Sequence, residues 1–125
     1  MTYTGTFQNT VYRDELFGGG DGFPVEIINV QLASDSTVTR GTIIAGDTPK
    51  STFAAVSSAA DAEKFLAVVA EDFTATDSDS SVTSAYSAGK FNREKLILAD
   101  GLDINDFENA LRKQNIILTS IKEIY

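Results

Sequence analysis

The chain contains no cysteine, no histidine and no tryptophan. Without cysteine it can form no disulfide, thiolate nucleophile or zinc–thiolate site. Without histidine it lacks the commonest general base and the commonest transition-metal ligand, and a Ser-His-Asp triad is excluded. These absences predict that the protein is not an enzyme and that it uses no cofactor and no metal ion.

Basic residues and long apolar runs are also scarce. Lys and Arg number 10 against 18 Asp and Glu, which gives a net charge of −8 and disfavours direct binding to nucleic acid. The longest apolar run, residues 65–70, is far shorter than the roughly 20 residues of a membrane-spanning helix. The N-terminus has neither the basic nor the apolar region of a secretory signal. We therefore expect synthesis in the cytoplasm and no membrane contact.

The composition is that of one folded domain. The chain has 125 residues, of which 42% are hydrophobic and 22% charged, and this size and balance are typical of a single globular domain. A shift in character near residue 22 divides the chain into an extended N-terminal arm, residues 1–22, and a β-rich domain, residues 23–125.

The predicted arm has the pattern of a strand with one adhesive face. Across residues 2–7, threonines alternate with aromatic or small residues, and the glycine-rich run at 18–22 indicates a hinge. A mobile terminus without a partner is the alternative, but the arm carries more aromatic and apolar residues than an inert tail. The residues assigned to partner contact are Thr2, Tyr3, Thr4, Thr6, Phe7, Val11, Tyr12, Leu16 and Phe17, and those assigned to the hinge are Gly18, Gly19, Gly20 and Gly22.

The remainder reads as short strands separated by turns, which predicts an α+β class in which strands dominate. A turn is expected at Gly89–Lys90, directly after one of the strands, and residues 59–64 fit either a single helical turn or a loop. The predicted strands are residues 25–32, 39–45 with a break at Gly41, 53–56, 65–70, 82–88 and 116–125.

One short helix is predicted near the C-terminus. Asp103 can cap it, and Ile104, Phe107 and Leu111 fall on one face. The helix should end near Gln114 or Asn115. Its apolar face is expected to be core, because a short amphipathic helix normally packs on a sheet; a partner-binding stripe is the alternative.

The clusters of carboxylates in the sequence give little support for a calcium site or a catalytic site. Asp77, Asp79 and Ser81 have the spacing of calcium ligands, but the glycine and glutamate that complete an EF-hand are missing, so a solvated loop is expected. Glu71 and Asp72 are adjacent, and adjacent strand residues point to opposite faces. A glycosidase-like carboxylate pair is therefore disfavoured.

Four segments together resemble those of phage head decoration proteins, the family of the lambda head decoration protein. The order and rough spacing of the segments agree with the family, and the likeness extends over residues 23–121. Lys90 stands where an acidic residue is usual. The segments are residues 30–44 (VQLASDSTVTRGTII), 68–76 (VVAEDFTAT), 89–92 (GKFN) and 108–117 (ENALRKQNII).

The resemblance implies a small β-rich fold, the β-tulip, and a role as capsid cement. Members of the family form homotrimers on the outer surface of the icosahedral head, at three-fold positions. They bind after the head expands and brace it against the pressure of packaged DNA. Their N-terminal segment faces the shell and can add a strand to the major capsid protein, a mode of binding that fits the predicted arm.

The expected function is therefore capsid decoration, with the major capsid protein and other copies of the chain as partners and the outer surface of the virion as its location. The alternative is a small surface- or carbohydrate-binding β-domain of a phage tail or adhesin, which would need an aromatic platform on the folded body. An enzyme that uses carboxylates alone is the least favoured class.

Overall fold

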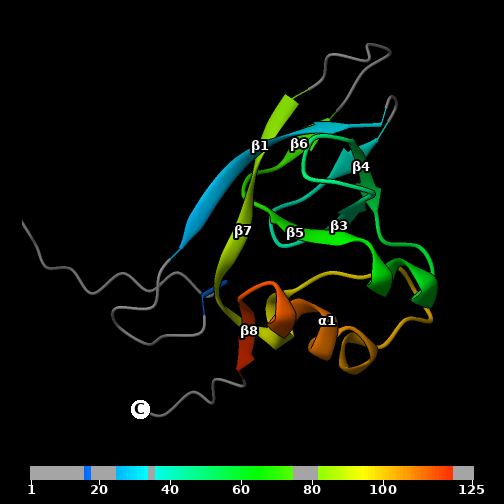
Figure 1. The fold of residues 1–125 in the computed structure, drawn as a ribbon, viewed down its shortest axis with the longest axis vertical. Helices are drawn as coiled ribbons and strands as arrows, with labels where there is room; N and C mark the ends of the chain where they lie inside the picture. Colours follow the sequence, from blue (N-terminus) through cyan, green and yellow to red (C-terminus); the bar gives the residue numbers. More distant parts are fainter. Residues whose placement is uncertain (1–15, 18–24, 34–35, 75–81, 120–125) are drawn as a thin grey trace, which may run out of the picture.

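The computed structural model describes residues 16–17, 25–33, 36–74 and 82–119. Strands dominate and one short α-helix is present, which confirms the α+β class (Figure 1). The strands are β1 (Glu26–Leu32), β2 (Thr37–Val38), β3 (Ile43–Gly46), β4 (Thr52–Ala55), β5 (Phe65–Val69), β6 (Phe73–Thr74), β7 (Val82–Asn92) and β8 (Ile116–Thr119). The helical segments are the 3-10 turns η1 (Ala59–Glu63), η2 (Arg93–Lys95) and η3 (Ile104–Asp106) and the α-helix α1 (Glu108–Lys113).

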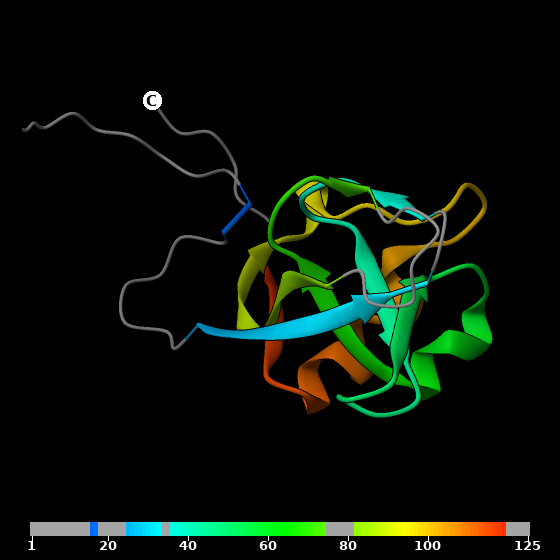
Figure 2. The same cartoon turned by 90° about the horizontal axis from the view of Figure 1, so that it is seen from above.

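Five of the strands close into a small barrel. Their order is β1-β4-β3-β5-β7, and β7 pairs in turn with β1 to complete the ring (Figures 1 and 2). The β1–β4 and β7–β8 pairs are parallel, whereas the other pairs are antiparallel. Strand β8 extends the sheet at the end of β7, and β2 and β6 form a separate two-stranded ribbon.

Strand β5 shows why its sequence reads as an unbroken apolar run. Ala67 and Val69 belong to the cluster inside the barrel, and Leu66 and Val68 belong to a second cluster on its outer side. Because successive strand residues point to opposite faces, a strand covered on both faces needs apolar residues at every position. All four of these side chains are fully buried, so β5 is the central strand of the domain.

The second cluster, which we call the outer cluster, joins the barrel to the helical segments. These segments lie together below β3 and β5 in Figure 1. The inner cluster comprises Val30, Leu32, Val38, Ile44, Phe53, Ala67, Val69 and Ala85. The outer cluster comprises Leu16, Ile43, Ala45, Val56, Leu66, Val68, Phe91, Phe107, Leu111, Ile116 and Leu118. One sector of the barrel's outer surface is thus covered by a packed helical layer.

The predicted helix forms as two pieces instead of one. Asp103 caps the first piece as expected, its carboxylate accepting a 2.9 Å hydrogen bond from the Asn105 backbone N–H. The N–H of Phe107 then bonds to the Ile104 carbonyl in the tighter 3-10 pattern, and the α-helix begins only afterwards. Phe107 and Leu111 are both fully buried, which confirms the prediction that this face is core.

The turn predicted at Gly89–Lys90 is wrong, because β7 continues through both residues to Asn92. Gly89 lies where β7 leaves β1 and pairs with β8, and its N–H donates to the Asn115 carbonyl. A Cβ at this position would lie 3.0 Å from the Phe91 ring. The glycine therefore permits close packing along a strand instead of reversing the chain.

One other boundary differs from expectation. The strand predicted from residue 39 begins only at Ile43, because Gly41 adopts φ +98° and approaches the Lys95 carbonyl, where a Cβ would lie 2.8 Å from the oxygen. Residues 59–64, predicted as a single helical turn or a loop, contain the 3-10 turn η1, which confirms the helical alternative. The last predicted strand is confirmed as far as Thr119, and residues 120–125 lie outside the described residues.

Asp61 stabilises the start of η1, and this gives a pH-dependent prediction. Its carboxylate accepts backbone hydrogen bonds from Ser57 (3.0 Å) and Ser58 (3.3 Å) and pairs with the Lys64 ammonium at 3.3 Å. The bond from Ser57 is the main cause that lowers the pKa of Asp61 below its ordinary value of 3.8, with Lys64 adding to it. A lowered pKa means that this stabilisation is present above pH 3.8 and is lost as the pH falls through the folded-state pKa.

We expect Asp61→Ala to lower the free energy of unfolding at neutral pH by about 0.5–2 kcal/mol, the usual value of such a cap. The difference from the unchanged protein should shrink as the pH falls below 3.8. Urea unfolding over this pH range measures both quantities, with Glu63→Ala, an exposed position in the same turn, as control. A difference that does not vary with pH would contradict the prediction.

Candidate partner-binding surface

Leu16 and Phe17 fasten the N-terminal segment to the barrel. The Leu16 carbonyl accepts a 2.8 Å hydrogen bond from the Asn92 N–H, and Phe17 forms an antiparallel bridge with Phe91. The Leu16 side chain is only 4% exposed and belongs to the outer cluster. Since Phe91 also pairs with Leu118 of β8, residues 16–17 occupy the opposite edge of β7.

Aromatic packing reinforces this attachment. The Phe17 ring stacks on Phe91 at a centroid distance of 5.4 Å and meets Tyr86 edge-on at 5.2 Å. The Arg40 guanidinium lies 5.8 Å from the centre of the same ring, in the range of a cation–π contact. We call this arrangement of residues 16–17 on β7 the N-terminal anchor.

The anchor corrects the predicted arm. The sequence pattern predicts partner contact for Leu16, but its side chain is buried in the domain's own core, and Phe17 packs against that core. Both residues belong to the body, so the predicted boundary after residue 22 is wrong for them. The apolar character that suggested adhesion to a partner reflects internal burial here. The other arm and hinge residues, Thr2, Tyr3, Thr4, Thr6, Phe7, Val11, Tyr12, Gly18, Gly19, Gly20 and Gly22, lie outside the described residues.

A second surface, which no local sequence pattern singled out, covers the outside of β7, β1 and β4. In β1, Val30 and Leu32 point into the barrel, so the alternate residues point outward. The register pairs Gln31 with Val82 of β7 and with Thr52 of β4, which places all three on the outer side. We call the seven outward residues the neutral face: Ile27, Asn29, Gln31, Thr52, Ala54, Val82 and Ser84.

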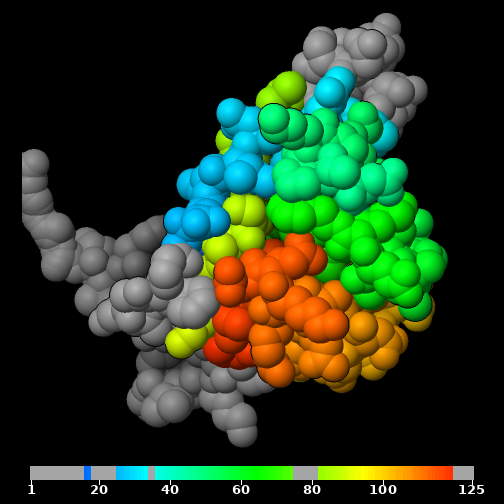
Figure 3. All heavy atoms as spheres, in the orientation of Figure 1, coloured from blue at the N-terminus to red at the C-terminus, as the bar shows by residue number. Residues whose placement is uncertain are grey.

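None of the seven residues is charged, and none of the described helical segments covers them. Figure 3 shows β1, in blue, and β4, in blue-green, side by side at the surface, with the helical layer below them. Ile27 is 61% exposed and Val82 53%. Residues 25–32 are predicted as a strand, but only the pairing of β7, β1 and β4 assembles this surface.

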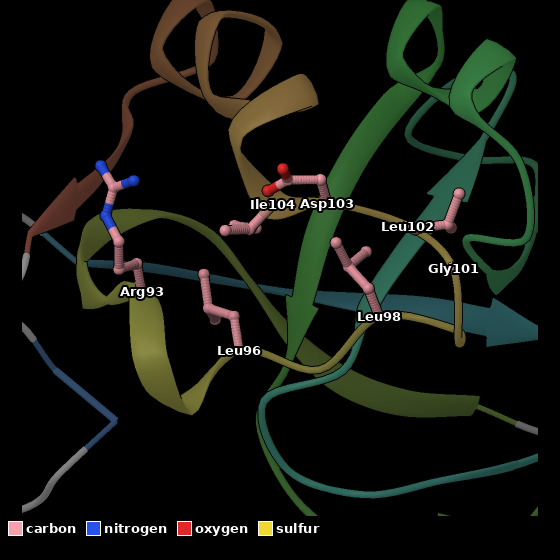
Figure 4. Close-up of a pocket in the computed structure, with 7 residues that line it drawn as sticks. All are labelled: Arg93, Leu96, Leu98, Gly101, Leu102, Asp103 and Ile104. Atoms are coloured by element: carbon pink, nitrogen blue, oxygen red, sulfur yellow. The ribbon is translucent and has the colours of Figure 1, made fainter.

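A shallow groove lies on the helical side of the molecule (Figure 4). It has a volume of about 500 Å³, and Leu96, Leu98, Leu102 and Ile104 supply its apolar lining. Arg93 at one end is held by Asn105 and Glu108, each at 2.7 Å. The two terminal guanidinium nitrogens are thus engaged within the domain, whereas Nε is buried without a hydrogen-bond partner. The Asp103 carboxylate also lines the groove and accepts a hydrogen bond from the Asn105 backbone N–H.

Two of the carboxylates considered for chemistry, Glu71 and Asp72, make contacts within the fold. The Asp72 carboxylate accepts a 2.8 Å hydrogen bond from the Arg40 backbone N–H, and Glu71 faces the Thr83 hydroxyl at 3.5 Å. Asp77, Asp79 and Ser81 lie outside the described residues. Within the described ranges, no group of three or more acidic side chains is arranged to hold a metal ion.

The segments that resemble decoration proteins meet in pairs. The first and second segments are joined by hydrogen bonds of 2.9 Å from Gly41 N–H to Val69 O and from Val69 N–H to Thr42 O. Arg40 adds two contacts between them, through its backbone N–H to Asp72 and its Nε to the Ala70 carbonyl. These residues hold strands together, so this part of the likeness concerns the fold.

The third and fourth segments are paired in the same way. Gly89 and Lys90 of β7 lie beside Ile116 and Ile117 of β8 in parallel register. Leu111, also in the fourth segment, is fully buried in the outer cluster. All four segments therefore contribute to the connections that close the barrel and attach its helical layer.

No model of a known protein family matches the chain, and no curated protein sequence matches it. In the part of the chain that the structure describes, no helix is long and apolar enough to cross a membrane.

Proposed function

We propose that this chain is a capsid decoration protein that binds as a homotrimer to the outer surface of the expanded phage head, at three-fold positions. Its partner is the major capsid protein, and its role is to stabilise the head against the internal pressure of packaged DNA. The protein is synthesised in the host cytoplasm and acts on the virion surface. It works by binding alone, without catalysis, cofactor or direct contact with nucleic acid.

The observation that carries the proposal is the pairwise meeting of the four similar segments. Residues far apart in the sequence, such as Arg40 and Asp72, come together as parts of one structural unit. This supports the resemblance as one of fold, and the family's function is carried over from it.

The N-terminal anchor supports the proposed mode of binding. Because Leu16 and Phe17 are fixed on β7, residues 1–15 start from a defined point on the body. The alternating pattern of residues 2–7 suits addition of a strand to a capsid sheet, in which main-chain hydrogen bonds supply affinity. Three arms on one trimer would raise the affinity by roughly 10²–10⁴-fold through avidity.

The anchor also determines how the proposal is tested. Purified protein is pelleted with expanded and unexpanded heads that lack it, beside a variant lacking residues 1–15. The deletion stops before Leu16, because removing that residue would damage the core and confuse loss of fold with loss of contact. We expect saturable binding to expanded heads only, lost on deletion although the unfolding curve is unchanged. Failure to bind either head would refute the proposal, and binding that survives the deletion would refute the role of the arm.

The carbohydrate-binding alternative finds no support on the body. Every aromatic side chain among the described residues is buried or half-buried, whereas a sugar platform needs an exposed ring. The exposed large apolar side chains of the described ranges are all aliphatic. A glycan array tests this alternative directly, and we expect no binding.

A further inference from the structure

The neutral face has no charged side chain, although the whole chain carries a net charge of −8. It includes Ile27 and Val82, the two most exposed large apolar side chains of the described residues. Glu26 at the start of β1 and Lys50 before β4 are exposed charged residues at its margin, and many other charged side chains of the described residues lie on or beside the helical segments. Exposed examples there are Glu63, Lys64, Glu94, Lys95, Asp106, Arg112 and Lys113.

We propose that the neutral face binds a second copy of this chain. Each copy carries a net charge of −8, so two copies repel unless the surfaces that meet avoid like charges. A surface with no charged side chain meets this condition. Nucleic acid would require basic side chains and a sugar would require an exposed aromatic ring, and the neutral face has neither.

The chemistry of the face suits contact between copies. Ile27 and Val82 offer apolar area, and the side-chain amides of Asn29 and Gln31 each carry both donors and acceptors. Such amides can pair with polar groups of either kind on the neighbouring copy. Apolar anchors with satisfied polar groups around them are the usual composition of a protein interface.

The backbone of β1 adds a second binding element beside the face. Residues 26–30 pair with β7 on one edge, but β4 joins β1 only at Gln31 and Leu32. No other described strand occupies the remaining edge of residues 26–30, and Figure 1 shows the start of β1 diverging from β4. An open edge can accept a further strand through main-chain hydrogen bonds. In a ring of copies, the face and edge of one copy would meet a different surface of the next.

This inference deepens the proposed function and rests on it only for the number of copies. It is tested without capsids by sedimentation velocity over a range of protein concentrations. We expect the unchanged protein to associate, and Ile27→Glu with Val82→Glu to weaken association about hundredfold or more, because two carboxylates would be buried in the contact without a partner. Ile97→Glu is the matched control, since Ile97 is also aliphatic and 42% exposed but lies outside the face, and it should leave association unchanged.

A second measurement uses the absence of native cysteine. Asn29→Cys places one thiol on the face, and Ala99→Cys places one at an exposed control position. Maleimide labelling of the first thiol should slow as protein concentration rises, whereas labelling of the second should not.

Three results would overturn the inference: a protein that stays monomeric at every concentration, equal effects of the face and control substitutions, or equal labelling of the two thiols. Because no head is present, any of these would leave the proposed binding to heads standing. Failure to bind heads would in turn leave self-association through this face intact.

Discussion

Replacing Phe91 with alanine is expected to lower the free energy of unfolding by about 3–5 kcal/mol, the range for large aromatic residues truncated in a core. The Phe91 side chain is fully buried, and its ring contacts both Phe17 and Tyr86. Its backbone lies between the N-terminal anchor and β8. A cavity at this point would weaken the packing of the N-terminal anchor, of β8 and of Tyr86 against Phe91.

The effect of Phe91→Ala is measured by urea unfolding followed by circular dichroism, because the chain has no tryptophan to serve as a fluorescent probe. Phe73→Ala is the matched control, since Phe73 is only half-buried and lies in the short β6 strand. Phe73→Ala should lower the free energy of unfolding by clearly less than Phe91→Ala does. Equal losses for the two variants would contradict the central position assigned to Phe91.

Replacing Leu16 with alanine is expected to cost about 2–5 kcal/mol of unfolding free energy, as for other leucines truncated in a core. The side chain is buried among residues of the outer cluster, and it lies close to Gly41, where an added Cβ would be 3.4 Å from its Cδ1 atom. If Leu16 lay in a free arm, its truncation to alanine would leave the free energy of unfolding unchanged. Urea unfolding of Leu16→Ala thus distinguishes a core residue from an arm residue.

Leu98→Ala supplies the control for Leu16→Ala, because Leu98 packs at the margin of the same cluster and is half-buried. We expect a smaller loss there. An unchanged unfolding curve for Leu16→Ala would refute the anchor and would return Leu16 to the segment available for capsid contact. The head-binding deletion would then have to extend beyond residue 15.

Much of the fold follows from local pattern. The apolar run at β5 and the Val- and Ile-rich stretch at β1 each predict a strand, and the face shared by Phe107 and Leu111 predicts a short helix packed on the core. Strand periodicity and burial depend mainly on which side chains must leave water, and that is encoded residue by residue. The absence of cysteine and histidine likewise narrows the chemistry that is open to the chain, whatever its fold.

The errors arose where distant residues decide the outcome. Gly89 looked like a turn because glycine commonly reverses a chain, but β8 and the Phe91 ring, both supplied by the tertiary structure, keep it within β7. Leu16 looked like part of an adhesive arm because nothing near it in the sequence covers it. Its neighbours in the core include Phe107 and Leu111, which lie about ninety residues away in the numbering.

The sequence by itself therefore determined the class of fold, the position of most strands and the chemistry that the chain lacks. Only the tertiary structure decided that β1 closes the barrel against β7, that residues 16–17 belong to the body, and that an uncharged surface spans β7, β1 and β4. Periodicity shows that a strand has two faces, but it does not show which face is covered. That depends on pairings between residues far apart in the chain, and these pairings exist only once the barrel has closed.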